Sequence, residues 1–505
     1  MESLSDTQWD VVISGTGLQQ SLLALALSRS GKNILHVDPN EYYGEAEAVL
    51  SLQEADEWAA QHQSADGDGV FAAAQATRPG GAESSSSSRA YSLALAPQLI
   101  HTRSELLSKL VSSKAFRQLE FLAVGSFYIH QSSSAESSAP SLSRIPSTRE
   151  DVFANTTISV KAKRGLMKFL KFVLEYDSVP QTDVWRPHAD DSLASFLAAE
   201  FKLDADLQAY VAALTLSLDG NISTKAGLAA IHRHLTSMGV FGAGFAAVYP
   251  KWGGLSEIAQ VGCRAGAVGG AVYMLGVGIK DVEEASSTAE THDELDIVLT
   301  NDMAIKSKTL VKGLGKPAGA SRRLSRLTAV VNSGLPSLFE TVGEGAPTPA
   351  VAVVAFPSGT AFGQEGASSE YPIYALAHSS DSGECPAGQC VLYLSTLANP
   401  NAQTHLEKAL SSLLASLSPG DQEPPQLLYQ LCYEQIGFDT PSVDIDGQSV
   451  VFSLLPLDLA FNDSALDPVR QAWEMVLPDA TAGEREEYLV FTDREGVDAE
   501  DEFEN

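Results

Sequence analysis

The sequence predicts an α/β fold in which a sheet domain is interrupted by a small helical domain. A β-branched run, Val11 to Ile13, is followed by two glycines, an apolar helix and a second apolar strand ending at Asp38, which is the pattern of a βαβ unit. From Lys161 to Thr236 the apolar residues instead recur at helical spacing, and strand patterns return after Met274.

The βαβ unit has the layout of a dinucleotide-binding start, but its phosphate loop departs from the pattern. Gly15 and Gly17 supply the tight turn before the helix, and Asp38 follows about 20 residues later, as in Rossmann-type units. The third glycine of the pattern, where helix and strand pack closely, is replaced by Gln20. Because this side chain crowds the pyrophosphate site, we expect a flavoprotein-like fold that has lost its cofactor.

Composition and charge argue against several classes of function. The chain has 505 residues and a net charge of −31, from 33 Lys and Arg against 64 Asp and Glu. Such an acidic protein is unsuited to direct contact with nucleic acid or with anionic membrane surfaces. The apolar runs are short and the first residues are polar and acidic, so we expect neither a membrane span nor a signal peptide, and a cytosolic location.

Motifs for enzymatic chemistry and for metal binding are missing from the sequence. It contains no G-x-x-x-x-G-K-[ST], H-E-x-x-H or G-x-S-x-G. His232 and His234 alternate on a helix, which is the wrong spacing for one metal, and no second ligand pair accompanies Cys385 and Cys390. We therefore expect no catalytic residues, no metal site, and reduced thiols in a loop.

Two stretches are expected to lack stable structure. Residues 54–88 are rich in Ala, Gln, Gly and Asp and end in a serine run, so a disordered insertion is predicted there. From Glu484 onward the chain is strongly acidic and is expected to fray, although a role in docking a basic partner stays open. The predicted divisions are a first part of the sheet domain (1–130), the inserted helical domain (145–238), a second part of the sheet domain (239–483) and the acidic tail (484–505).

Three blocks of sequence carry a family resemblance. They are D-P-N-E-Y-Y-G at residues 38–44, the segment from Ile145 to Tyr176, and the segment from Met238 to Leu275. In this order and at this spacing they resemble the superfamily of Rab escort proteins and Rab GDP-dissociation inhibitors. The resemblance implies a flavoprotein-like fold without flavin that binds small GTPases of the Rab class.

The second block is similar to the escort-protein branch. Pro146, the run from Glu150 to Phe153 and the run from Leu166 to Leu170 resemble that branch, in a divergent or fungal-type form, whereas the inhibitors differ before this helix. The resemblance implies an accessory component of Rab geranylgeranyl transferase, without chemistry of its own. Such a protein binds GDP-form Rab, presents it to the catalytic heterodimer for C-terminal prenylation, and carries the lipidated Rab to membranes with only transient membrane contact.

In the family the helical domain holds the geranylgeranyl lipid between its helices, and in escort proteins it docks the transferase near an exposed phenylalanine. Phe241, flanked by Gly239 and Gly242, is the candidate that the resemblance indicates. The alternatives are a core phenylalanine at the end of a helix and an ordinary helical core without a ligand.

The resemblance also implies a GTPase-binding surface formed by Tyr43, Glu257, Arg264 and Met274, which match the family positions that grip the Rab switch regions. Glu257 and Arg264 are seven residues apart, about two helical turns, so both can face one way. Arginine offers a planar fork for carboxylates, and tyrosine and methionine offer desolvated contact. A salt bridge between Glu257 and Arg264 within the domain is the alternative.

Two other functions remain open after this interpretation. The nearer is a Rab GDP-dissociation inhibitor, which recycles prenylated Rab without the transferase. The farther, from a different class of protein, is an FAD- or NAD-dependent oxidoreductase.

Overall fold

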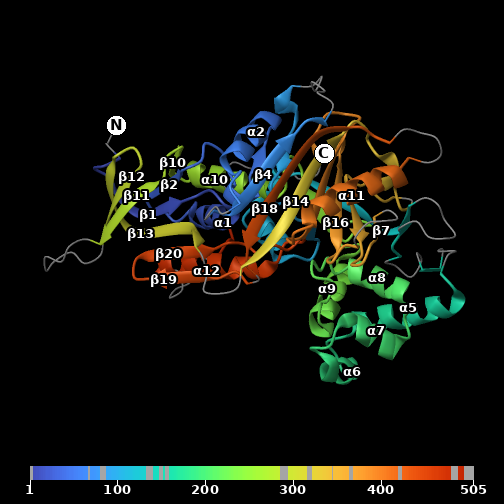
Figure 1. Ribbon diagram of the computed structural model, residues 1–505. Coiled ribbons are helices and arrows are strands. Elements are labelled where there is room, and N and C mark those ends of the chain that lie inside the picture. The colour runs from blue at the N-terminus through green and yellow to red at the C-terminus, as the bar shows by residue number, and fades with distance from the viewer. Residues whose placement is uncertain are drawn as a thin grey trace.

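The computed structural model contains two large sheets, with a helical domain attached to one of them (Figure 1). The residues that the structure describes are 4–65, 69–79, 87–131, 140–146, 152–153, 158–284, 294–315, 321–343, 345–362, 368–418, 424–438, 440–478 and 487–493.

The first sheet has eight strands and contains the predicted βαβ unit. β1 (Gln8–Ser14) pairs in parallel with β2 (Ile34–Asp38), and α1 (Leu18–Leu27) connects them. Every residue of α1 is buried, because α10 (Leu255–Val268) and α12 (Leu466–Val476) pack against it. The other strands of this sheet are β10 (Val272–Leu275), β11 (Ile279–Glu284), β12 (Leu295–Leu299), β13 (Ala304–Gly315), β19 (Val443–Asp446) and β20 (Ser449–Ser453).

The centre of the first sheet is β13. It pairs in parallel with β1 on one side, and it pairs antiparallel with β12 and in parallel with β20 along its length. At the other edge β10 pairs in parallel with β2, which places Met274 opposite Val37.

The second sheet has ten strands and carries most of the chain after residue 321. It runs in the order β4-β18-β14-β17-β16-β15-β7-β9-β6, with β8 on β7. The bounds are β4 (Phe71–Thr77), β6 (Ile100–His101), β7 (Phe121–Gln131), β8 (Ser141–Arg144), β9 (Ala247–Pro250), β14 (Arg322–Val331), β15 (Val351–Phe356), β16 (Ile373–Ser379), β17 (Cys390–Leu397) and β18 (Leu427–Gly437). The strands β14 to β18 therefore belong to this second sheet and not to the sheet that contains the βαβ unit.

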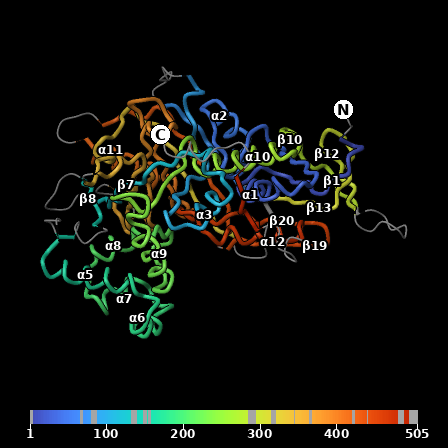
Figure 2. The backbone as a smooth tube through the Cα atoms, turned by 180° about the vertical axis from the view of Figure 1, so that it is seen from behind, coloured from blue at the N-terminus to red at the C-terminus, as the bar shows by residue number. Residues whose placement is uncertain are grey.

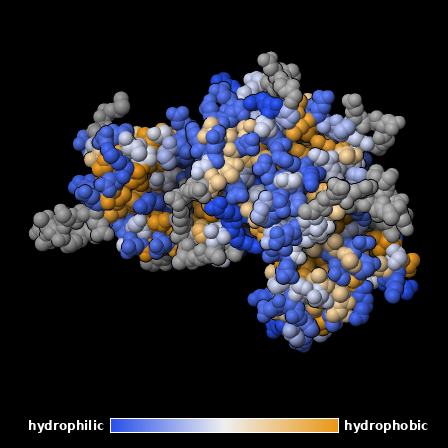
Figure 3. Space-filling model, in the orientation of Figure 1, coloured by the Kyte–Doolittle hydropathy of each residue, from blue (hydrophilic) through white to orange (hydrophobic). Residues whose placement is uncertain are grey.

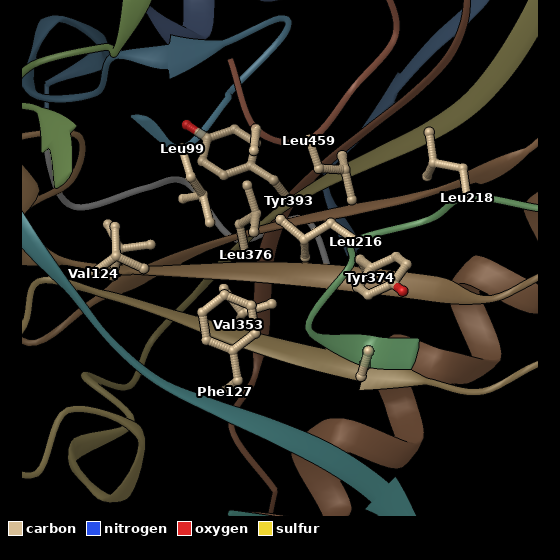
Figure 4. Close-up of a cluster of buried hydrophobic side chains, with 14 of the residues drawn as sticks. Leu99, Val124, Phe127, Leu216, Leu218, Val353, Tyr374, Leu376, Tyr393 and Leu459 are labelled. Carbon is tan, nitrogen blue, oxygen red and sulfur yellow. The ribbon is translucent and has the colours of Figure 1, made fainter. Parts of the chain in front are cut away.

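The late strands form their own sheet because both of their faces are apolar. Every residue of β15 and β16 is buried. On one face α11 (Ala402–Ser416) packs against β14 and β17. On the other, Leu216 and Leu218 of the helical domain belong to the same hydrophobic cluster as Val353 and Tyr374, as Figure 4 shows.

The helical domain projects from the second sheet, and Figure 2 shows it from behind. Its helices are α5 (Val160–Leu174), α6 (Gln181–Trp185), α7 (Leu193–Phe201), α8 (Ala205–Ala213) and α9 (Thr224–Ser237). Four of the five begin at a Ser or Asp whose side chain accepts a backbone N–H, which satisfies an otherwise unpaired donor. Their core is aromatic, with the ring centroids of Phe169 and Phe201 5.2 Å apart.

The predicted disordered insertion at 54–88 is wrong for most of that stretch. α2 (Leu52–Gln61) begins with a capping box between Ser51 and Glu54, and β4 pairs with β18. Trp58 is 3% exposed, with its ring centroid 5.1 Å from that of Phe71. The composition did not predict this short helix and strand, because most of their residues are small or polar. The two aromatic side chains, Trp58 and Phe71, are enough to bury them. Residues 66–68 and 80–86 lie outside the described residues.

The expected fraying from Glu484 is wrong for residues 487–493. Tyr488 and Leu489 are buried, and the N–H of Phe491 donates to the carbonyl of Ser112 at 3.0 Å, next to α3 (Glu105–Ser112). Asp493 pairs with Arg117 at 3.1 Å. Three apolar side chains, those of Tyr488, Leu489 and Phe491, hold this segment in place. The acidic composition of the segment did not indicate their burial. Residues 484–486 and 494–505 lie outside the described residues.

The face of the molecule seen in Figure 3 is mainly polar, with apolar side chains gathered in patches. On the helical domain, exposed apolar residues include Val160, Leu174, Val179 and Val184. In the described parts of the chain, no helix has the length and hydropathy needed to cross a bilayer.

Candidate functional site

The turn between β1 and α1 keeps a dinucleotide-binding backbone but is filled by side chains. Gly15 has φ +93°, which glycine adopts without strain. Gln20 is 3% exposed, and its Nε2 donates to Oε2 of Glu45 at 2.8 Å. A Cβ atom on Gly17 would lie 2.6 Å from Oε2 of Glu45 and 3.0 Å from Oε1 of Gln20. These two side chains therefore occupy the space beside the glycines.

Two acids of the short turn η1 (Glu45–Glu47) reach the N-terminus of α1. The N–H of Gly17 donates to Oε2 of Glu45 at 3.2 Å, and the N–H of Leu18 donates to Oε2 of Glu47 at 3.2 Å. In dinucleotide-binding units, amides at this position bind the pyrophosphate. Since the chain's own carboxyl groups use these donors, the residues present do not fit a dinucleotide.

Asp38 stands where such units place the acid that binds the ribose, but both of its oxygens have partners within the protein. Oδ2 accepts the N–H and the hydroxyl of Thr16 at 2.7 and 2.6 Å. Oδ1 accepts the N–H and the side-chain amide of Asn40 at 2.8 and 3.0 Å. The side chain holds the loop that follows β2 in place.

The pKa values of Glu45 and Glu47 are shifted towards neutral pH. Burial, followed by the nearby charges of Asp38 and Glu47, raises the pKa of Glu45 to about 8. Burial raises the pKa of Glu47 to about 7, although the hydrogen bond from Leu18 acts in the opposite direction. Both values lie well above those of exposed glutamates.

The structure brings the four predicted GTPase-binding residues to one edge of the first sheet. Tyr43 lies in the loop after β2, Met274 lies on the neighbouring edge strand β10, and α10 carries Glu257 and Arg264. The loop and β10 are joined directly, since the N–H of Gly276 donates to the carbonyl of Asn40 at 2.9 Å.

Arg264 is exposed, and its guanidinium donates to Oε1 of Gln118 at 3.3 Å. Among the described residues, no ion pair within 4.0 Å joins it to Glu257, so the alternative of an intradomain salt bridge is wrong for this structure. The positive charge of Arg264 still affects the pKa values of Glu257 and Tyr43. Burial raises the pKa of Glu257 and of Tyr43, and the charge of Arg264 opposes the rise in each case.

Several residues around this edge were not predicted. The ring of Tyr273 lies 4.8 Å from that of His36 and beneath α10, where a Cβ atom on Gly266 would lie 2.6 Å from its hydroxyl. Glu45, Glu47 and Thr16 also escaped the sequence analysis. An acid directly after Tyr-Tyr-Gly was the available signal, but its burial depends on the loop folding back on α1.

Phe241 is 60% exposed, in the loop between α9 and β9. The alternative of a core phenylalanine is therefore wrong. Gly239 and Gly242 on either side have φ +78° and +148°, and the neighbouring Val240 is 41% exposed. The loop holds two apolar side chains out of the domain.

A cavity of about 210 Å³ separates α7 and α8 from β15 and β16. Its walls are largely apolar and include Ala209, Ile222, Phe356 and Tyr374. The volume is below the range of roughly 300–1,000 Å³ found for pockets that enclose small ligands. This cavity is therefore smaller than such ligand pockets.

In the described residues, no cluster of three or more His, Cys, Asp or Glu could hold a metal ion. The four cysteines are free and buried. Cys390 lies in β17 and not in a loop, because the strand extends further than its apolar run indicated.

Comparison with known proteins yields a family and a set of relatives. The family described as GDP dissociation inhibitor matches residues 5–332. Rab proteins geranylgeranyltransferase component A of Saccharomyces cerevisiae is 30% identical, with 81% of this chain and 65% of that protein covered. The protein of the same name from Candida albicans is 30% identical, with 81% and 62% covered. The chain thus spans less than two thirds of the length of both relatives.

Solved structures share the fold. Rab GDI from Plasmodium falciparum superposes with a TM-score of 0.64 at 19% identity, covering 92% of this chain and 97% of that one. An oxidoreductase from Methanosarcina mazei gives 0.55 at 12% identity, covering 94% and 100%. The predicted flavoprotein-like α/β fold is confirmed.

Proposed function

Because the chain belongs to the GDP dissociation inhibitor family, we propose that it acts as a Rab escort protein. It binds GDP-form Rab GTPases, presents them to Rab geranylgeranyl transferase for C-terminal prenylation, and delivers the lipidated Rab to membranes. It performs no chemistry itself, and it works from the cytosol with transient membrane contact.

One observation carries the proposal. The cofactor site of a flavoprotein-like fold is filled by Glu45 and Glu47, directly beside the surface that carries Tyr43 and Arg264. This arrangement suits a binding protein and leaves a dinucleotide oxidoreductase without its phosphate site. The oxidoreductase alternative has only a shared fold in its favour.

The GTPase-binding surface consists of Tyr43, Glu257, Arg264 and Met274. Arg264 is exposed and unpaired with Glu257 among the described residues, so its guanidinium can donate two hydrogen bonds to a carboxylate of a partner. Tyr43 and Met274 are half-buried, so they lose little conformational freedom on binding. These properties are those of interface hot spots.

The helical domain supplies the lipid site in this proposal. Burial of each methylene of a C20 prenyl chain contributes about 0.8 kcal/mol of stabilisation. This gain offsets the cost of opening a closed apolar core. The cavity between α7, α8 and the second sheet is where the helices would separate. Phe241, exposed on the neighbouring loop, is the transferase contact.

The test is a reconstituted prenylation reaction with GDP-loaded Rab, the transferase heterodimer and geranylgeranyl diphosphate. We expect lipid transfer to Rab only when this chain is added. Rab binding without support of prenylation would favour the inhibitor, which the fold shared with Rab GDI keeps as the second candidate. A bound flavin with no Rab binding would favour the oxidoreductase.

A further inference from the structure

We propose that the carboxyl groups of Glu45 and Glu47 are a built-in ligand of the former phosphate loop, and that they position Tyr43 for the GTPase. The inference rests on the proposed function for its second half only. Neither acid touches the partner directly in this scheme; both act through the loop that carries Tyr43.

The loop from Asp38 to Glu47 is fixed at both ends on α1 and its preceding turn. At the start, the hydroxyl of Thr16 donates to Asp38 at 2.6 Å and accepts the N–H of Gly44 at 3.0 Å. At the end, Glu45 and Glu47 accept the first amides of α1. Tyr43 is the residue directly before Gly44, so its backbone is held between these two anchors.

The conformation of the loop depends on the contacts of Glu45. This residue has φ +43°, in the left-handed region that side chains other than glycine rarely adopt. Such a conformation persists where surrounding contacts determine it. Here Gln20 and Gly17 hold the carboxyl group, at 2.8 and 3.2 Å.

The titratable groups that surround Glu45 and Glu47 determine how these two acids respond to pH. Asp38 and Glu47 act on Glu45 as like charges, and Tyr42 is a neighbouring phenol whose pKa burial raises to about 12. His36 contacts the carbonyl of Gly15 at 2.6 Å, and burial lowers its pKa to about 4, so it adds no positive charge at neutral pH. Lys312 precedes Gly313 on β13 and, by strand alternation, faces away from Glu45.

Deprotonation should therefore loosen the loop. Burial raises the pKa values of Glu45 and Glu47, so the folded loop favours their protonated forms, and this contribution to the loop is lost as the pH rises through about 7 to 8. When both groups ionise in a buried site beside Asp38, repulsion opposes the contact. Rab affinity is then expected to fall with rising pH.

The first arm titrates GDP-loaded Rab against wild type and E45Q/E47Q from about pH 6.5 to 9. Glutamine imitates the protonated acid at every pH, so the affinity of E45Q/E47Q for Rab should not depend on the state of these two groups. Across the pH range, the affinity of wild type should fall about tenfold more than the affinity of E45Q/E47Q. E41Q is the matched control, because Glu41 is an exposed acid of the same loop. It should keep the wild-type profile. Superimposable profiles for wild type and E45Q/E47Q would overturn the positioning role.

The second arm needs no Rab. Hydrogen exchange of the amides of Gly17 and Leu18 is compared in wild type, E45A/E47A and E41A. We expect exchange at least tenfold faster in E45A/E47A only, and E45Q/E47Q serves if the alanine pair does not fold. Unchanged exchange would refute the built-in ligand. If wild type binds no Rab at all, the proposed function and the positioning role both fail, and this arm still decides the first half.

Discussion

Tyr249 donates its hydroxyl hydrogen to Oε1 of Glu384 at 2.9 Å, in a fully buried cluster. Tyr393 and His378 contact Oε2 of the same carboxyl at 2.9 and 2.8 Å. Burial raises the pKa of both tyrosines, so their hydroxyls remain donors. The cluster joins β9, which leads into α10 and the GTPase-binding surface, to β16 and β17.

Removing the carboxyl from this cluster should be costly. Glu384→Ala leaves two buried hydroxyls and a histidine without their acceptor, and we expect a loss of about 3–5 kcal/mol in the free energy of unfolding. Tyr249→Phe removes one donor and should lose about 1–3 kcal/mol. Urea denaturation of both variants measures the difference. Equal, small losses would show that the cluster does not stabilise the fold.

Arg264, exposed on the proposed GTPase-binding surface, gives a second prediction. Arg264→Ala should weaken binding of GDP-loaded Rab by about 1–3 kcal/mol, because an interface guanidinium is lost. The melting temperature should not change, since Arg264 is exposed. Arg470→Ala on α12, also exposed, is the control in the same calorimetric titration. Wild-type affinity in Arg264→Ala would remove this residue from the surface.

Phe241, the proposed transferase contact, gives a third prediction. Phe241→Ala should abolish prenylation in the reconstituted reaction while Rab affinity and melting stay at wild-type values, because an exposed side chain contributes little to folding. Phe153→Ala is matched to it, since both side chains are 60% exposed. Equal prenylation by the two variants would place the transferase contact elsewhere.

The filled phosphate loop gives a fourth. The purified protein should be colourless and should take up no FAD on mixing. Gln20→Gly alone should not restore binding, because Glu45 and Glu47 still hold the helix amides. Absorbance spectra after desalting measure both; a stoichiometric flavin spectrum of wild type would support the oxidoreductase.

Buried histidines give a fifth, on acid stability. Burial lowers the pKa of His234 to about 4, so its neutral form is favoured on folding and stability is lost as the pH falls from about 6.5 towards 4. We expect about 2 kcal/mol of loss at pH 5 from this residue. Glu45 and Glu47 act in the opposite direction, so the comparison must be made with His234→Phe. That variant should lose less stability between pH 7 and 5, whereas the exposed-site control His188→Asn should behave as wild type.

The βαβ unit could be predicted because its signals are local. Two glycines, a β-branched strand and an acid at a set distance are enough to define it. β13 was not predicted from the sequence, because its residues, from Ala304 to Gly315, mix lysines with apolar residues. Its position depends on pairing with β1 on one side and with β12 and β20 on the other. The pairing of β13 with β1 joins residues about 300 positions apart, and no sequence window contains both strands.

The site was predictable to a similar degree. Tyr43, Glu257, Arg264 and Met274 were proposed from the resemblance; the structure places them at one edge of the first sheet, and their role in binding a GTPase stays a prediction. Glu45 was missed because acids are expected at the surface, and burial of one becomes visible only when its partners are known. Gln20 was identified as an obstacle to the cofactor, but its bond to Glu45 required the folded loop.

The central place of β13 has a consequence for how the chain must be made. During synthesis β1, α1 and β2 emerge first, and β1 keeps an open edge until residues 304–315 arrive. Even then β13 has an unfilled position until β20 at residues 449–453 is added, and α1 is covered by α10 alone until α12 follows. A nascent or truncated chain ending between these points carries an exposed strand edge and an apolar helix, the features that recruit chaperones or other unfinished chains.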